Sequence, residues 1–335
     1  MKEGAIKAWL FRAATELRLP SIVEAWARGV PILAYHGVTA SPSSPLGNIR
    51  RLHVPAQRFE KHLRVLSAEW RPVPLSELVE AIEAGRRLPE RSVVVTFDDG
   101  YRNILTTALP LLRKYSIPAT LFVATHNARR MWEDDVEVAI TLAQVESLRW
   151  NGDVHRLDTV EGKRRALLVI LRGLQRLGPE RERAIERLVV DLRMLSFPED
   201  DDRDLLSWDE LGVLQREGLE IGSHADRHGP LTERPVFEVR SALCKSLEEL
   251  SSRFGPGRYP LAYPYGASSG AISTAARDAG FSCALIARPG LNSSSTDLFA
   301  LKRFLIGADD DELRLRASLS GLRAFGRSGR AWGLR

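Results

Sequence analysis

The sequence contains only two cysteines in 335 residues, Cys244 and Cys283. So small a number excludes the disulfide framework of a small secreted domain and the paired cysteines of a zinc ribbon. We therefore expect free thiols, as is typical of a reducing compartment, while one bridge between the two cysteines stays open as an alternative.

The chain also lacks a long apolar run. No stretch approaches the ~18 apolar residues of a membrane-spanning helix, and charged residues such as Lys7, Arg12 and Glu16 interrupt the N-terminal segment. A signal peptide has an uninterrupted apolar centre, so this pattern predicts a cytoplasmic protein. Residues 1–30 are expected to form an amphipathic helix that packs against the domain or rests on a membrane surface.

Charge of one sign is not concentrated in a long block. The chain has 48 Lys and Arg residues against 43 Asp and Glu, a formal net charge of +5, and the two signs are interleaved. No basic block carries a nucleic-acid motif, so nucleic acid is not an expected partner. An anionic glycan or a membrane surface would use the same positive charge. Hydrophobic residues make up 44% of the chain, which is ordinary for a soluble globular protein.

The sequence does contain a regular alternation of short apolar runs and helical segments. Such alternation predicts a parallel sheet, and this many units favours a (β/α) barrel, whose active groups lie at the carboxyl ends of the strands. The predicted strands lie within 30–38, 91–100, 117–125, 218–225, 259–266, 281–288 and 298–306. The predicted helices include 57–69, 76–85, 104–115, 236–254 and 270–279.

Residues 126–206 depart from this alternation. They contain two amphipathic helices broken at Gly178-Pro179, without a strand signal. We interpret them as a mostly helical insertion that either covers one side of the barrel rim or forms a dimerisation hairpin. The barrel domain is expected to span 31–320, followed by a loosely ordered Gly- and Arg-rich tail over 321–335. Nothing in the sequence predicts the oligomeric state.

Two adjacent aspartates, Asp98 and Asp99, end the apolar run SVVVTF. Carboxylates are rarely buried without a partner, and two neighbouring ones repel each other, so the pair needs a positive charge. The alternative is a helix N-cap beside a surface residue. The other acidic runs, 134–135, 200–202 and 309–311, lie in polar settings and are interpreted as solvated surface.

Two histidines, His224 and His228, follow another predicted strand in the segment GSHADRH. A spacing of four on a helical turn sets two imidazoles on one side, within reach of one ion. Two histidines and one aspartate would leave positions open on a zinc-like ion for water and a substrate oxygen, as hydrolysis requires. The cation would also allow the second aspartate to remain an ionised base.

Three motifs, TFDDG, GSHADRH and LAYPYG, resemble in this order those of the polysaccharide deacetylase family, the NodB-homology group of carbohydrate esterase family 4. The resemblance extends from about residue 31 to 320, apart from the insertion. It implies a distorted (β/α) barrel with a divalent metal, Zn²⁺ before Co²⁺ or Ni²⁺. It also implies hydrolysis of N-acetyl groups on the N-acetylhexosamine units of a polysaccharide or glycan intermediate, with release of acetate.

The resemblance implies a role for each matching position. Asp98 corresponds to the general base of the family, and Asp99, His224 and His228 correspond to its metal ligands. Tyr265 corresponds to the residue whose backbone N–H helps to hold the oxyanion, an interaction that supplies a large part of such catalysis. Taken alone, the segment around Tyr265 would be interpreted as a Pro-Gly turn with core tyrosines.

Three features depart from the family pattern. Ala225 stands where Ser or Thr is usual, and Ala262 stands where an arginine is common. Arg303, at the end of a late predicted strand, is the candidate to orient the base instead, with a surface arginine as the alternative. No histidine follows His228 to act as the acid. We therefore assign that role to His36, as in the branch resembling poly-N-acetylglucosamine deacetylases; in isolation His36 would be a structural histidine.

Two other functional classes fit less well. An O-deacetylase or another amide hydrolase could use the same scaffold, and a non-catalytic glycan-binding protein could retain the fold. The complete set of aspartates and histidines argues against the binding protein, because a binding module needs no base beside a metal. Trp132 is expected either to stack on a sugar or to pack among helices of the insertion. The other histidines are interpreted as surface or packing residues: His53, His62, His126 and His155.

Overall fold

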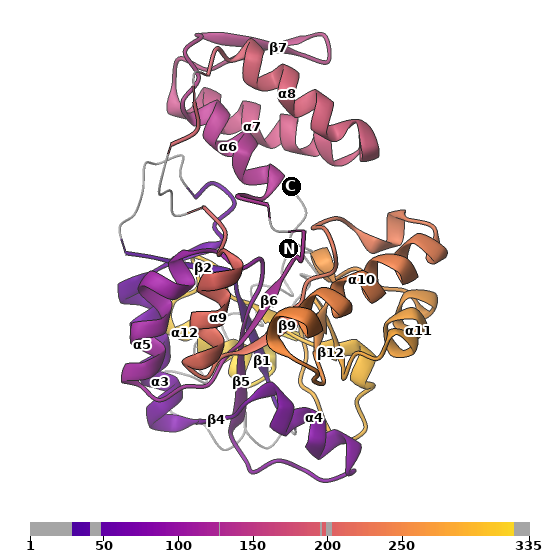
Figure 1. The fold of residues 1–335 in the computed structure, drawn as a ribbon. Coiled ribbons are helices and arrows are strands. Elements are labelled where there is room, and N and C mark those ends of the chain that lie inside the picture. Colours follow the sequence, from indigo (N-terminus) through magenta and orange to yellow (C-terminus); the bar gives the residue numbers. More distant parts are fainter. Residues whose placement is uncertain (1–28, 41–47, 127, 195, 199–202, 325–335) are drawn as a thin grey trace, which may run out of the picture.

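A computed structural model describes residues 29–40, 48–126, 128–194, 196–198 and 203–324 (Figure 1). The predicted N-terminal helix and most of the predicted tail lie outside the described residues. None of the described helices combines the length and the apolarity that crossing a bilayer requires. Cys244 and Cys283 are both free thiols.

The main body is a nearly closed parallel barrel, which confirms the predicted fold class. Its strand order is β12-β11-β10-β9-β6-β5-β1-β13, and β4 pairs with β5 outside this path. Arg303 alone separates β12 from β13, so one stretch of chain pairs with β11 on one side and with β1 on the other. The barrel strands are β1 (Ile32–Tyr35), β5 (Ser92–Phe97), β6 (Thr120–Val123), β9 (Glu220–Ser223), β10 (Leu261–Ala262), β11 (Ala284–Ile286), β12 (Leu301–Lys302) and β13 (Phe304–Leu305).

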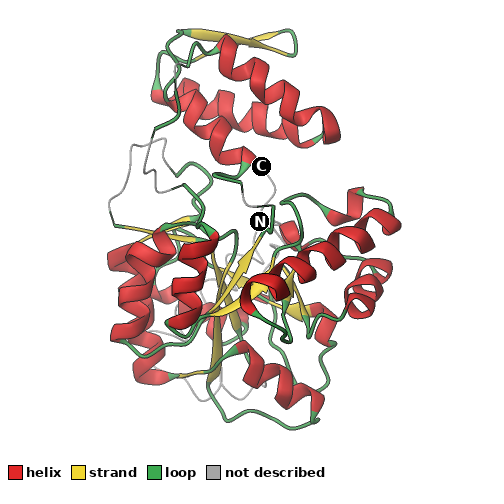
Figure 2. Cartoon of the chain, in the orientation of Figure 1, coloured by secondary structure: helices red, strands yellow, loops and turns green. Residues whose placement is uncertain are grey.

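Helices surround the barrel, as Figure 2 shows. Each predicted strand segment contains a barrel strand, and the predicted helices over 236–254 and 270–279 coincide with α10 and α11. The predicted helix over 104–115 begins as a π-helical turn, η1. The helices are α3 (Ala56–Glu69), α4 (Leu75–Glu83), η1 (Ile104–Ala108), α5 (Leu109–Lys114), α9 (Trp208–Arg216), α10 (Val236–Phe254), α11 (Gly270–Ala279) and α12 (Glu312–Leu319), and the minor strands are β2 (Gly37–Thr39), β3 (His53–Pro55) and β4 (Arg71–Pro72).

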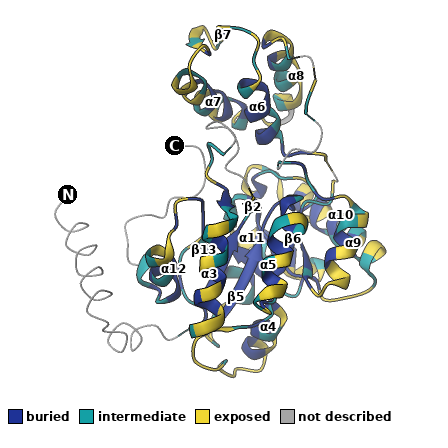
Figure 3. Ribbon diagram, turned by 90° about the vertical axis from the view of Figure 1, so that its left-hand side faces the viewer, coloured by how far each residue is buried: buried dark blue, intermediate teal, exposed yellow. Residues whose placement is uncertain are grey.

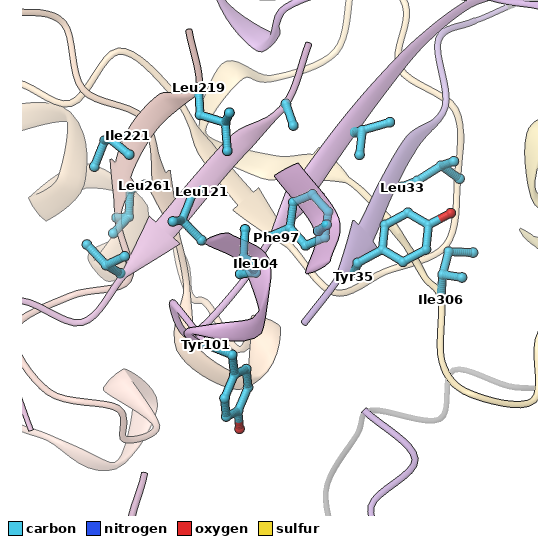
Figure 4. Close-up of a cluster of buried hydrophobic side chains, with 14 of the residues drawn as sticks. Leu33, Tyr35, Phe97, Tyr101, Ile104, Leu121, Leu219, Ile221, Leu261 and Ile306 are labelled. Atoms are coloured by element: carbon cyan, nitrogen blue, oxygen red, sulfur yellow. The ribbon is translucent and has the colours of Figure 1, made fainter. Parts of the chain in front are cut away.

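The barrel strands are buried on both faces (Figure 3). Alternate residues of a strand point to opposite sides. Tyr35, Phe97 and Leu121 belong to a large apolar cluster shared with the surrounding helices (Figure 4). Ile32 and Val94 belong to a second cluster that gathers strand residues from around the barrel and the apolar side chains of α4. The strand residues of this second cluster therefore point to the opposite side of the sheet from Tyr35 and Phe97.

The insertion folds as a separate lobe beyond the end of the barrel at which β6 ends (Figure 1). It has its own apolar core, drawn from α6, α7 and α8. As predicted, its last two long helices are separated near Gly178, but the expectation of no strand was wrong. An antiparallel hairpin turns at Asn151-Gly152, where both residues have positive φ, and Asn-Gly is a strong signal for such a turn. The lobe comprises α6 (Trp132–Thr141), β7 (Ser147–Trp150), β8 (Asp153–Arg156), α7 (Val160–Gln175), η2 (Gly178–Glu180) and α8 (Arg181–Asp191).

Candidate metal centre and active site

The three sequence motifs lie in the loops that follow β5, β9 and β10. Each loop contains a non-glycine residue with a left-handed backbone: φ is 73° at Asp99, 65° at Ala225 and 56° at Tyr265. Such conformations cost free energy and persist where the surrounding structure imposes them, often at functional sites. Each motif loop thus contains one of the eight described non-glycine residues with positive φ, and the other five lie elsewhere in the chain.

Asp99, His224 and His228 form a compact cluster whose possible ligand atoms all lie within 4.8 Å of one another. Asp99 Oδ1 is 3.5 Å from His224 Nε2 and 3.6 Å from His228 Nε2. Asp99 is buried, and no described residue donates a hydrogen bond to its Oδ1. A buried carboxylate oxygen without a donor, facing two imidazole nitrogens, fits a divalent cation bound by one oxygen and two nitrogen ligands.

Backbone contacts orient His224 for this cluster. Its Nδ1–H donates to the carbonyl oxygen of Ala262 at 2.7 Å, so the lone pair of Nε2 faces Asp99. A second hydrogen bond of this kind commonly fixes the tautomer of a metal-binding histidine. Burial lowers the pKa of His224, which keeps the imidazole neutral, despite the opposing charges of Asp98 and Asp99.

Glu133 and Tyr265 surround the second histidine. Glu133 Oε1 lies 3.5 Å from His228 Nδ1 and accepts a hydrogen bond from the Tyr265 hydroxyl. The Tyr265 ring lies 4.6 Å from the imidazole, centroid to centroid, at an interplanar angle of 32°. Burial favours the neutral imidazole, but the charges of Asp99 and Glu133 outweigh it and raise the pKa of His228 to about 9. The cluster therefore favours positive charge at this position.

Asp98 is held by Arg303. Arg303 Nη1 and Nη2 donate to the two carboxylate oxygens of Asp98 at 2.6 and 2.9 Å, and both residues are buried. Arg303 is therefore not a surface arginine. Burial alone would raise the pKa of Asp98, but the charge of Arg303, aided by His224 and His36, lowers it to about 2. Asp98 is consequently ionised at neutral pH.

His36 follows β1 directly and so lies beside the end of β5, because Tyr35 pairs with Phe97 in the parallel register. Burial lowers the pKa of His36 to about 4, against the opposing charge of Asp98. The imidazole is therefore neutral at neutral pH. The structure thus brings together all of the predicted site residues around one end of the barrel.

The sequence interpretation missed the buried acids of α6. Asp134 was expected at the solvated surface, but it accepts a hydrogen bond from Tyr101 at 2.8 Å and pairs with Arg50. Only 1% of its side chain is exposed. Glu133 is not among the predicted site residues, and nothing in the local sequence marks it, because its partners come from distant loops. Asp310, within another acidic run expected at the surface, is also buried and accepts from the Gly307 N–H.

Two further expectations are settled by packing. Trp132 packs against the core of the lobe with the Arg181 guanidinium 4.6 Å from its ring centroid, so helix packing is the observed role. His53 and His62 are buried packing residues. The acidic run at 200–202 lies outside the described residues.

Comparison with known sequences gives one family and several partial relatives. The family model described as polysaccharide deacetylase matches residues 85–284. A poly-beta-1,6-N-acetyl-D-glucosamine N-deacetylase of Staphylococcus epidermidis is 36% identical over 80 residues, which are 24% of this chain and 27% of the relative. A protein of the same name from Escherichia coli K12 is 42% identical over 50 residues, 15% of this chain and 7% of the relative. The chain thus matches less than a third of the length of either curated relative.

Solved structures share the fold at low sequence identity. The deacetylase PplD of Streptococcus pyogenes aligns over 87% of this chain and 98% of its own, with a TM-score of 0.59 and 16% identity. IcaB from Ammonifex degensii aligns over 88% of this chain and 97% of its own, with a TM-score of 0.58 and 19% identity. These similarities support the barrel architecture.

Proposed function

Since this chain belongs to the polysaccharide deacetylase family, we propose that it is a metal-dependent hydrolase of acetylated glycans. The reaction removes N-acetyl groups from N-acetylhexosamine units and releases acetate. One observation carries the proposal: an ionised carboxylate, held by a buried arginine, lies directly beside a cluster of two histidines and one aspartate. Such a pair of sites supplies a base next to a Lewis acid, as amide hydrolysis by water requires.

The metal ligands in this proposal are Asp99, His224 and His228. When bound, a divalent cation supplies Lewis-acid chemistry at the acetyl carbonyl and at the attacking water. Two imidazole nitrogens and one carboxylate oxygen suit Zn²⁺, with Co²⁺ and Ni²⁺ as alternatives. Three protein ligands leave room for water and substrate.

The remaining roles follow from protonation state and position. Asp98, ionised beside Arg303, takes the proton of the attacking water. The Tyr265 backbone N–H, presented by its left-handed turn, stabilises the developing oxyanion. His36 delivers a proton to the departing amine nitrogen. His36 is neutral before the reaction, so it has to gain this proton during the reaction. The donor is Asp98, which lies next to His36 at the rim and has taken a proton from the attacking water.

The substrate class follows from the relatives that match. The relatives from S. epidermidis and E. coli are named as N-deacetylases of poly-beta-1,6-N-acetyl-D-glucosamine. We propose an N-acetylglucosamine polymer or glycan intermediate for this chain. The cytoplasmic location stays a prediction from sequence, as does the expectation that the protein needs no nucleic-acid partner.

Acetate release tests the proposal directly. The full chain, stripped of metal and re-supplied with Zn²⁺, Co²⁺ or Ni²⁺, is incubated with β-1,6-linked N-acetylglucosamine oligomers. Acetate should form only after metal is restored, together with a free amine on the sugar. O-acetylated glycans without N-acetyl groups serve as the comparison substrate and should release little acetate. If no acetylated sugar yields acetate with any of the three metals, the proposed function is wrong.

A further inference from the structure

The first turn of α6 brings the inserted lobe into direct contact with the catalytic loops. Glu133, Asp134 and Glu137 lie on this helix and are all buried, with 3%, 1% and 2% exposure. Buried carboxylates require partners. Arg50 supplies charge for two of them, pairing with Asp134 and lying 3.5 Å from Glu137. The Glu133 carboxylate instead faces His228, one of the three proposed metal ligands.

Asp134 anchors this turn to the loop that carries the aspartate pair. The Tyr101 hydroxyl donates to Asp134 Oδ2 at 2.8 Å, and Tyr101 lies two residues after Asp99. Any shift of α6 relative to the barrel would therefore strain both this hydrogen bond and the pairing with Arg50. Because Asp134 is held in this way, the backbone of Glu133, the residue before it, is held in place as well.

Glu133 reaches the two other motif loops with a single carboxylate oxygen. Oε1 accepts the Tyr265 hydroxyl and lies 3.5 Å from His228 Nδ1. That nitrogen has no hydrogen-bond partner among the described residues. The distance is longer than that of a typical hydrogen bond. Glu133, from the insertion, is thus the described residue whose carboxylate faces this buried nitrogen.

We infer that Glu133 is a positioning residue that aligns the metal ligand His228 and the Tyr265 turn, which makes the inserted lobe part of the active site. When Nδ1–H faces Glu133, Nε2 of His228 faces Asp99 Oδ1, 3.6 Å away. His224 obtains the same orientation from the carbonyl of Ala262. One histidine is therefore oriented by the barrel and the other by the lobe. This inference rests on the proposed metal-dependent hydrolysis.

Metal affinity tests the inference without substrate. Zn²⁺ binding to the full chain is measured by chelator competition for wild type, Glu133→Met and Glu133→Gln. The methionine keeps the length of the side chain and removes the acceptor, so the Kd should rise about 10- to 100-fold, the usual range for losing such a contact. The glutamine keeps a weaker, neutral acceptor, and its Kd should rise by a smaller factor, at least about threefold.

Glu161→Gln is the matched control, because Glu161 lies on the lobe but pairs with Arg165 at the exposed surface. Its Kd should equal that of wild type. The visible spectrum of the Co²⁺ form gives a second readout: it should change in Glu133→Met and stay unchanged in Glu161→Gln, which general loosening of the lobe would not produce.

Two results overturn the inference. Wild-type Kd and an unchanged Co²⁺ spectrum in Glu133→Met would show that Glu133 does not position His228. If Glu133→Met does not fold, Glu133→Gln decides, and a Kd equal to that of Glu161→Gln would refute the role. The titration involves no glycan, so its outcome stands even if the wild-type chain releases no acetate, in which case only the proposed function fails.

Discussion

Asp98 and Arg303 are positioned directly by the barrel strands, because Asp98 follows β5 and Arg303 lies between β12 and β13, whereas His228 and Tyr265 lie farther along their loops and Glu133 lies on the inserted lobe. On the strand side, the period-two alternation of β5 sets the direction of Asp98, and the chain between β12 and β13 sets that of Arg303. On the lobe side, the alignment depends on how a unit with a separate apolar core is docked. We expect substitutions on the strand side to lower the catalytic rate or the stability of the fold. We expect substitutions on the lobe side to disturb the alignment of the site residues.

The largest effect should follow Asp98→Asn. Removal of the base should lower the rate of acetate release by about 10³-fold or more, near the upper range for general base catalysis. Zn²⁺ affinity should stay within a few-fold of wild type, because the three proposed ligands are unchanged. Acetate release and metal content are measured on the same preparation, and retention of a tenth of the wild-type rate would contradict the assignment.

Arg303→Met comes next, because it leaves a buried carboxylate without its partner. The free energy of unfolding in urea should fall by about 3 kcal/mol, the lower range for breaking a buried ion pair. Arg316→Met is the control: it breaks a half-exposed pair with Glu69 and should cost no more than about 1 kcal/mol. Equal losses of unfolding free energy in the two variants would show that the buried pair of Arg303 and Asp98 stabilises the fold no more than a surface pair does.

The barrel also contains a titrating group away from the site, His62. Its Nε2–H donates to the Asp310 carbonyl oxygen at 2.9 Å, and its Nδ1 accepts from Tyr35 at 3.2 Å. Burial lowers the pKa of His62 to about 4, from 6.5 as the ordinary value, against the opposing hydrogen bond to the Asp310 backbone. Folding therefore favours the neutral imidazole, and the contribution of His62 to stability is full above pH 6.5 and is lost as the pH falls toward 4.

The expected loss for His62 is about 2 kcal/mol at pH 5 relative to pH 8. His62→Gln, which can still donate to Asp310 and accept from Tyr35 but does not titrate, should flatten this part of the pH dependence. Urea unfolding at the two pH values measures the difference. An unchanged slope in His62→Gln would assign the acid sensitivity to other groups.

The smallest effect should follow Tyr101→Phe, which removes one of the anchors of α6. Asp134 keeps its pairing with Arg50, so the loss should be about 1.5 kcal/mol, the lower range for a hydrogen bond to a charged group. It should be visible as faster amide hydrogen exchange in α6, with little change in the barrel strands. Tyr115→Phe removes a comparable hydrogen bond, to Glu60 on the barrel surface, and should leave exchange in α6 unchanged. Equal exchange in both variants would show that Tyr101 does not anchor the lobe.

Much of the barrel and part of the site could be predicted because their signals are local. Runs such as SVVVTF and the helical segment over 236–254 show their periodicity directly in the sequence. The polar residues that end β5 and β9 mark the rim in the same way. The β7–β8 hairpin also has a local signal, Asn151-Gly152, but the amphipathic helical pattern that follows it dominates the segment and predicts helix alone.

The lobe side had no comparable signal. The sequence EDD at 133–135 indicates the acidic first turn of a helix. This local pattern would be the same whether the turn faced solvent or the proposed metal ligands. Only packing shows that Asp134 is buried against Tyr101 and that Glu133 meets Tyr265. The sequence shows that a side chain is charged, but it does not show which distant loop the folded chain places against that side chain.

Sequence alone specifies the strand ends, the aspartate pair and the histidine pair, because each depends on residues a few positions apart and on the fixed periods of strands and helices. Tertiary structure decides the pairing of Asp98 with Arg303, more than two hundred positions away, and the approach of Glu133 to His228. Closing the barrel brings the first two together, and docking the lobe brings the second two together. Neither event leaves a local trace, because the contacts form between segments whose separation along the chain carries no periodicity.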